Sequence, residues 1–172
     1  MTARCASRLA ALGTLLVAGV AHADSTVLLE GEVPDDGVAY FEIPFEVPTG
    51  TAEIEIRHDD LSEGNILDWG LLSPEGFRGY GGGNTEPAIT GLQSASRSYL
   101  PGPITAGTWR IYVGEAQIVE RPARYRVEVI LRDVAALAPE PERAPYAPVA
   151  ALDTDARWYA GDFHVHSRES GD

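Results

Sequence analysis

Ala39-Tyr40-Phe41-Glu42-Ile43-Pro44-Phe45-Glu46-Val47 is the stretch of sequence that decides the fold. Its apolar residues at positions 41, 43, 45 and 47 alternate with residues that suit contact with water. Successive side chains of a β-strand point to opposite faces, so this period of two predicts a strand with one buried and one wet face. Such strands belong to antiparallel sheets packed face to face, rather than to a parallel sheet buried on both sides.

The same alternation extends outward from this strand, at 52–57, 109–113 and 125–131. Between 27 and 131 the sequence shows no long stretch of helical period, and short runs are separated by turn-forming residues. These clusters are Pro34–Gly37, Pro48–Gly50, Ser73–Gly76, Gly81–Asn84 and Ala106–Thr108. We therefore predict a mainly β domain over 24–133, an antiparallel β-sandwich or jelly roll with Trp109 in its core.

The first 23 residues have the pattern of a secretory signal peptide. Arg4 and Arg8 precede an apolar run, and an A-x-A site ends at Ala23. The run has about 12 residues, which is too short to cross roughly 30 Å of hydrocarbon as a helix. We expect cleavage, export to the periplasm or the extracellular space, and no stable membrane insertion. A lipoprotein is disfavoured because Cys5 precedes the apolar run.

The composition is acidic, with 26 Asp and Glu residues and a net charge of −13 in a chain of 172 residues. Loss of Arg4 and Arg8 with the signal peptide moves that charge to −15, and all the basic residues are arginine. Such a surface repels phosphate backbones, so nucleic acid is not an expected partner. Cys5 is the sole cysteine, so the mature chain has no disulfide and must be stabilised by a hydrophobic core.

An Ala/Pro-rich linker is expected over 134–156. Prolines at 139, 141, 145 and 148 favour an extended and fairly stiff segment. A second structural unit then begins at 157.

Asp162, His164 and His166 alternate in Trp158–His166, a stretch rich in aromatic and β-branched residues. On a strand these three side chains share one face, with successive members about 6.5 Å apart along the chain. Two imidazoles brought together in this way can ligate one metal ion if the strand end bends. A bare His-x-His pair also occurs in surface or packing roles, so the pattern alone leaves both interpretations open.

Gly161-Asp162-Phe163-His164-Val165-His166-Ser167 resembles the opening motif of PHP (polymerase and histidinol phosphatase) domains. The resemblance implies that this motif ends the first strand of a (β/α)7 barrel, truncated here. It also implies that His164 and His166 bind one ion of a cluster of two or three divalent metals (Zn, Mn or Fe). Asp162 and Asp172 are candidates for supporting the ligands, although many members have Ser-Asp-Gly where this chain has Ser170–Asp172.

The sandwich region also resembles the exported carbaryl-hydrolase-like (CehA/McbA) branch of this family, through 65–71, 77–82, 99–104 and 107–109. The resemblance implies that the chain is the N-terminal part of an exported hydrolase that uses metal-activated water on a small-molecule ester, carbamate or phosphoester. The chain by itself would then be inactive, because two histidines are fewer than the three protein ligands usual in catalytic zinc sites. The alternative is a secreted β-sandwich binding module without a catalytic role.

Other candidate sites have plainer interpretations. His58-Asp59-Asp60 with Glu63 is either a cation site or, as we favour, a solvated acidic loop. Tyr112 and Trp69 are either sugar-stacking platforms or, more commonly for aromatic residues in a sandwich, packing residues. The sequence leaves the oligomeric state open.

Overall fold

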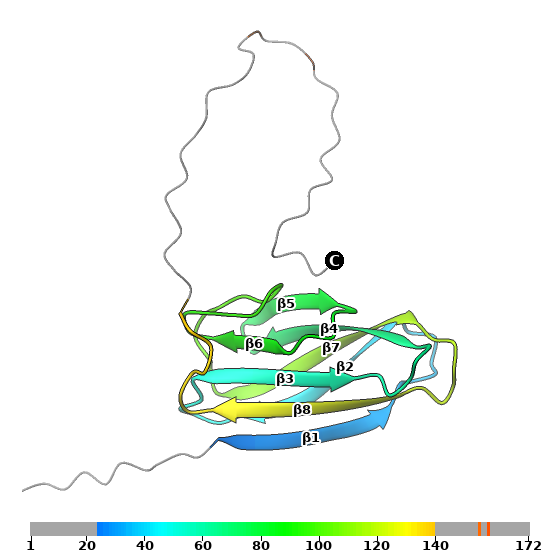
Figure 1. The fold of residues 1–172 in the computed structure, drawn as a ribbon, viewed down its shortest axis with the longest axis horizontal. Coiled ribbons are helices and arrows are strands. Elements are labelled where there is room, and N and C mark those ends of the chain that lie inside the picture. The colour runs from blue at the N-terminus through cyan, green and yellow to red at the C-terminus, as the bar shows by residue number, and fades with distance from the viewer. Residues whose placement is uncertain (1–23, 140–154, 156–157, 159–172) are drawn as a thin grey trace, which may run out of the picture.

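A computed structural model describes residues 24–139 together with 155 and 158 (Figure 1). Eight antiparallel strands form two four-stranded sheets, and the described residues contain no helix. The first sheet has the order β1-β8-β3-β6, with β1 (Ser25–Glu32), β8 (Arg124–Arg132), β3 (Glu53–Asp59) and β6 (Ala88–Gly91). The second has the order β2-β7-β4-β5, with β2 (Tyr40–Val47), β7 (Gly107–Gln117), β4 (Ile66–Ser73) and β5 (Gly76–Gly82).

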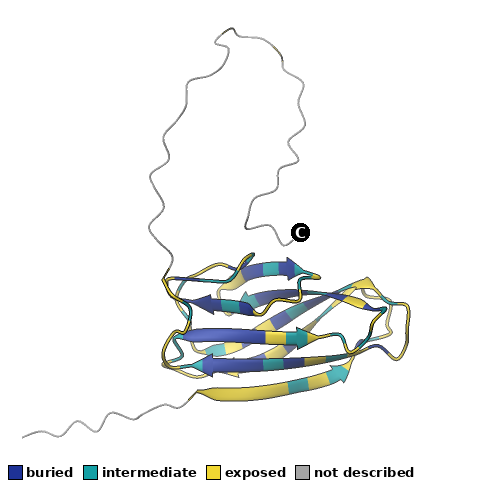
Figure 2. Ribbon diagram, in the orientation of Figure 1, coloured by how far each residue is buried: buried dark blue, intermediate teal, exposed yellow. Residues whose placement is uncertain are grey.

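The hydrophobic core lies between the two sheets in a sandwich-like arrangement (Figure 2). Both sheets contribute side chains that are fully buried, among them Ile54 and Val127 from the first and Trp109 and Val113 from the second. The predictions of a mainly β chain, of antiparallel sheets and of a buried Trp109 are confirmed.

Strand β2 shows why the alternating stretch forms an edge strand. Ile43, Phe45 and Val47 face the core, and the intervening residues are exposed. Pro44 has no N–H to donate to a neighbouring strand, and a proline is tolerated where only one side of the strand is paired. Accordingly β2 pairs with β7 alone, with Pro44 opposite Arg110.

The predicted turn Gly81–Asn84 is present at the end of β5. The Asn84 N–H donates a hydrogen bond to the Gly81 carbonyl oxygen at 3.3 Å, and Gly81 and Gly82 are also the last two residues of the strand. A Cβ on Gly79 would clash with the Ser98 carbonyl oxygen, and one on Gly81 would lie 3.2 Å from the Tyr99 hydroxyl oxygen. The glycines of this strand therefore leave room for the 98–100 segment, a role that glycine often has inside strands. This segment pairs with β5, because the Tyr80 N–H donates to the Ser98 carbonyl oxygen at 3.1 Å and the Leu100 N–H to the Arg78 carbonyl oxygen at 2.8 Å.

Several sequence predictions lie outside the described residues: the signal peptide at 1–23, most of the linker, and the first barrel strand with its motif. Among the residues the structure describes, no helix is long and apolar enough to cross a membrane.

Candidate functional site

The predicted metal site cannot be placed relative to the sandwich. His164, His166, Asp162 and Asp172 all lie outside the described residues. Within the part of the chain that the structure describes, no group of three or more His, Cys, Asp or Glu side chains is arranged to hold a metal ion.

The acidic candidate His58-Asp59-Asp60 with Glu63 lies at the end of β3 and lines a surface hollow of about 450 Å³. Two of its carboxylates hold the backbone turn that follows. Asp59 Oδ1 accepts a hydrogen bond from the Leu61 N–H at 2.8 Å, and Asp60 Oδ1 accepts one from the Ser62 N–H at 3.3 Å. Aspartates that bond to the backbone two residues on are typical of turns, and this structural role accounts for both residues.

His58 belongs to β3 rather than to a loop, and it packs against the core. Its ring stacks on Trp69 with centroids 4.6 Å apart and planes at 17°. Burial lowers the pKa of His58 to about 4, against a smaller opposing effect of the Asp59 charge, so the imidazole is neutral at pH 7. Trp69 is only 3% exposed, so its ring is packed in the core rather than available as a platform for sugars.

Tyr112 does lie on the outer face of the second sheet, within a group that we call the tyrosine cluster: Tyr40, Tyr112 and Tyr80. The ring centroids of Tyr40 and Tyr112 are 5.3 Å apart, and those of Tyr80 and Tyr112 are 6.0 Å apart. The Tyr80 hydroxyl donates a hydrogen bond to Asp68 at 2.9 Å. Burial, and then this hydrogen bond, raise the pKa of Tyr80, so it stays protonated at all ordinary pH values.

Tyr80 lies close to the backbone of the neighbouring strands because two glycines make room for it. A Cβ on Gly70 would lie 2.7 Å from Tyr80 Cδ2, and one on Gly114 would lie 3.0 Å from the Tyr80 hydroxyl oxygen. An aromatic ring that covers a glycine on an adjacent strand compensates for the missing side chain. The tyrosine cluster is therefore a well-supported aromatic surface whose outermost ring, Tyr40, is 53% exposed.

Arg78 is a buried cation that the sequence analysis missed. Its guanidinium lies 5.2 Å from the ring centroid of Trp109 and donates to Thr90 Oγ1 at 2.8 Å and to the Pro103 carbonyl at 2.8 Å. It also donates to the Leu100 carbonyl at 3.2 and 3.0 Å. Arg78 thereby holds the 100–103 loop against the core, which is a structural role.

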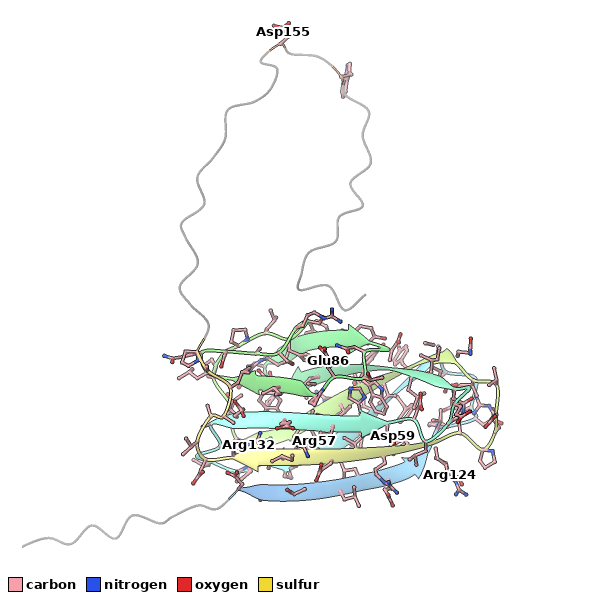
Figure 3. All side chains as sticks on the ribbon, viewed as in Figure 1. Arg57, Asp59, Glu86, Arg124, Arg132 and Asp155 are labelled. Atoms are coloured by element: carbon pink, nitrogen blue, oxygen red, sulfur yellow. The ribbon has the colours of Figure 1, made fainter. Side chains whose placement is uncertain are left out.

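Glu53, Arg132 and Leu137 form a buried contact where the chain leaves β8. Arg132 Nη1 donates to Glu53 Oε1 at 3.1 Å, and the Leu137 N–H donates to Glu53 Oε2 at 2.9 Å. Figure 3 labels Arg132, the last residue of β8. The Glu53 side chain is completely buried, and the second carboxylate paired with Arg132, that of Glu55, is 8% exposed. Ser94 Oγ completes the contact by donating to the Leu137 carbonyl at 3.1 Å.

These contacts fix residues 134–139, which we call the exit segment, across the end of the first sheet. Beside the exit segment lies an apolar groove of about 620 Å³, which we call the exit groove. It is lined by Thr51, Ala52, Leu92, Gln93, Ser94, Pro103, Ile104, Val134, Ala135, Leu137 and Pro139. The tyrosine cluster and the exit groove are two surfaces of the described residues that offer apolar contact area to another group.

No protein-family model matches this chain, and no curated protein matches its sequence. Its function is therefore argued from the motif residues and from the geometry above.

Proposed function

We propose that this chain forms the N-terminal part of an exported, metal-dependent hydrolase of the PHP type. In this proposal residues 24–133 are an accessory domain, and His164 and His166 are the first metal ligands of the catalytic domain. The observation that carries the proposal is the motif Gly161–Ser167, which follows a separate sandwich-like domain and a proline-rich stretch in the sequence.

The donor set at the motif suits the proposed chemistry. Two neutral imidazoles with a nearby carboxylate fit Zn, Mn or Fe, and a bound ion of this kind lowers the pKa of water and polarises the bond to be hydrolysed. Asp162 precedes His164 by two residues in the sequence, so on a strand it would share the face of His164 and could orient an imidazole by accepting its hydrogen bond. Asp172 is a further candidate for this supporting role.

The described residues support an accessory role for the sandwich. Its one histidine, His58, is neutral and packed on Trp69, and its buried arginine, Arg78, is bound to backbone carbonyls and to Thr90. These groups stabilise the domain and have no free position for substrate chemistry. The acidic charge of the chain further supports a small-molecule substrate rather than nucleic acid.

The test is hydrolysis by the full-length protein. We expect divalent-metal-dependent cleavage of an aryl ester, an aryl carbamate or a phosphodiester, and a loss of at least about 100-fold in kcat/KM for His164→Ala and for His166→Ala. His58→Phe is the matched control, because it changes a histidine outside the motif and keeps an aromatic ring on Trp69. Hydrolysis that survives both motif substitutions would refute the proposal, as would metal-dependent turnover by residues 24–172 alone.

A secreted binding module is the second candidate function, and the tyrosine cluster is the observation that favours it. Exposed tyrosine rings on the outer face of a sheet offer apolar contact together with hydroxyl groups. This candidate predicts that Tyr40→Ala weakens binding of a ligand such as an oligosaccharide and that His164→Ala does not. Calorimetric titration of both variants with the same oligosaccharide separates the two candidates.

A further inference from the structure

The exit groove differs from the rest of this acidic surface because none of its lining residues carries a charge. Large apolar side chains stand open to solvent along it, with Leu92 60% exposed and Val134 72% exposed. Its volume of about 620 Å³ falls in the range of roughly 300–1,000 Å³ that is typical of binding pockets. Open apolar surface of this kind normally marks a place where another group packs.

The position of the groove indicates what that group is. The exit segment supplies four of the lining residues, ending with Pro139, and it is already bonded to the sheet through Glu53 and Ser94. The chain that follows Pro139 therefore starts at the wall of the groove. A segment tethered at this point has a high effective concentration at the groove, which a separate molecule lacks.

The sequence after Pro139 contains a stretch that matches the groove in polarity. Ala144-Pro145-Tyr146-Ala147-Pro148-Val149-Ala150-Ala151-Leu152 has no charged residue and lies between Arg143 and Asp153. Its prolines restrict the unbound chain to extended conformations, which reduces the entropy lost on docking into an apolar groove. Residues 140–143 span at most about 14 Å, enough for the chain to turn back toward the groove.

We propose that Ala144–Leu152 packs into the exit groove, with Tyr146 and Val149 covering Leu92 and Val134. The docked segment continues the packing of the exit segment against the sandwich. It shortens the free tether before the Gly161–Ser167 motif to Asp153–Ala160, so the sandwich holds the residues that follow close to its own end. This inference does not depend on whether His164 and His166 bind metal.

Disulfide trapping in the mature chain tests the inference, because loss of Cys5 leaves a background without cysteine. One variant carries Leu92→Cys with Val149→Cys. The matched control carries Ala136→Cys with Val149→Cys, since Ala136 is exposed, lies next to the groove and does not line it. If residues 140–152 did not dock, residue 149 would meet residue 136 more readily than residue 92, because the loop between 136 and 149 is shorter. The Ala136 pair would then form its disulfide faster.

We expect the Leu92 pair to form an intramolecular disulfide about tenfold faster than the Ala136 pair, because docking raises the local concentration of residue 149 at Leu92. Equal rates, or a faster Ala136 pair, would overturn the inference. Disulfide-linked dimers as the main product of the Leu92 pair would also overturn it and would identify a second copy as the occupant.

A double-mutant cycle gives an independent check that requires no oxidation. Leu92→Ser and Val149→Ser are each expected to lower the thermal midpoint of the mature chain, and the double variant to lose less than the sum of both shifts. Strictly additive shifts would show that the two side chains do not touch, against the inference.

Discussion

Replacing Arg132 with leucine removes the cation that pairs with both Glu53 and Glu55, and leaves Arg57 as a partner of Glu55 alone. The Arg132 side chain is 15% exposed, and its partners Glu53 and Glu55 are 0% and 8% exposed. Loss of one partner from a buried ion pair leaves an uncompensated charge, at a cost of about 3–5 kcal/mol. That is a large part of the 5–15 kcal/mol by which a domain is usually stable.

Arg126 provides the matched control on the same strand. It pairs with Glu30 at 2.6 Å, but both side chains are about half exposed, at 53% and 49%. An exposed pair contributes roughly 0.2–1 kcal/mol, so Arg126→Leu is expected to have a small effect. In urea unfolding followed by tryptophan fluorescence, Arg132→Leu should lower the midpoint by about 1–3 M and Arg126→Leu by a fraction of that.

The pH dependence of the Arg132→Leu deficit follows from the pKa of Glu55. Burial raises that pKa, but hydrogen bonds from Arg132 and Arg57, with their charges, outweigh burial and hold it below its ordinary value of 4.5. A carboxylate with a lowered pKa contributes stability above its unfolded pKa, and this contribution is lost as the pH falls through the folded value. The deficit should therefore be largest at pH 7 and shrink below pH 4.5. An Arg132→Leu deficit no larger than that of Arg126→Leu would refute the buried-charge account.

His58 and Gly70 give two further predictions. The pKa of His58 is about 4 in the folded state against 6.5 when unfolded, so acidification from pH 6.5 to 4 should destabilise the protein by up to about 3 kcal/mol. His58→Phe should remove this dependence, which urea unfolding across that pH range measures, and an unchanged pH profile would contradict the burial of His58. Gly70→Ala should destabilise by about 1–3 kcal/mol, because the new methyl group would lie 2.7 Å from Tyr80 and 3.1 Å from the Gly79 carbonyl oxygen. Adding Tyr80→Ala should recover part of that loss in thermal unfolding, and no recovery would indicate that the backbone contact dominates.

The fold could be predicted from the sequence where a strand shows a clear alternation of apolar and polar residues. Residues 41, 43, 45 and 47 alternate clearly, and β2 occupies that stretch with its apolar side chains inward. Strands β5 and β6 were not predictable in the same way. Gly79 and Gly81 in β5 leave room for the 98–99 segment, and no local pattern in the sequence indicates this contact.

The candidate sites depend on long-range contacts even more strongly. The sequence predicts His58 as a loop residue, because two aspartates follow it. Its position is instead determined by stacking on Trp69, which comes from the opposite sheet. The contact between Glu53, Arg132 and Leu137 joins residues that no local pattern links, and alternation at 52–57 alone would place Glu53 in solvent. In the sequence this contact is represented only by a glutamate and an arginine near strand ends. Both residue types are common on exposed strands, so their presence does not predict a buried pair.

Metal binding at His164 and His166 tests the central proposal most directly. X-ray absorption at the metal edge of residues 24–172, loaded with one equivalent of Zn²⁺, measures the ligands of the bound ion. The proposal predicts weak binding with two imidazole nitrogens at about 2.0–2.1 Å, lost in His164→Ala and in His166→Ala and kept in His58→Phe. Zn²⁺ binding that is absent, or that both motif substitutions leave unchanged, would contradict it.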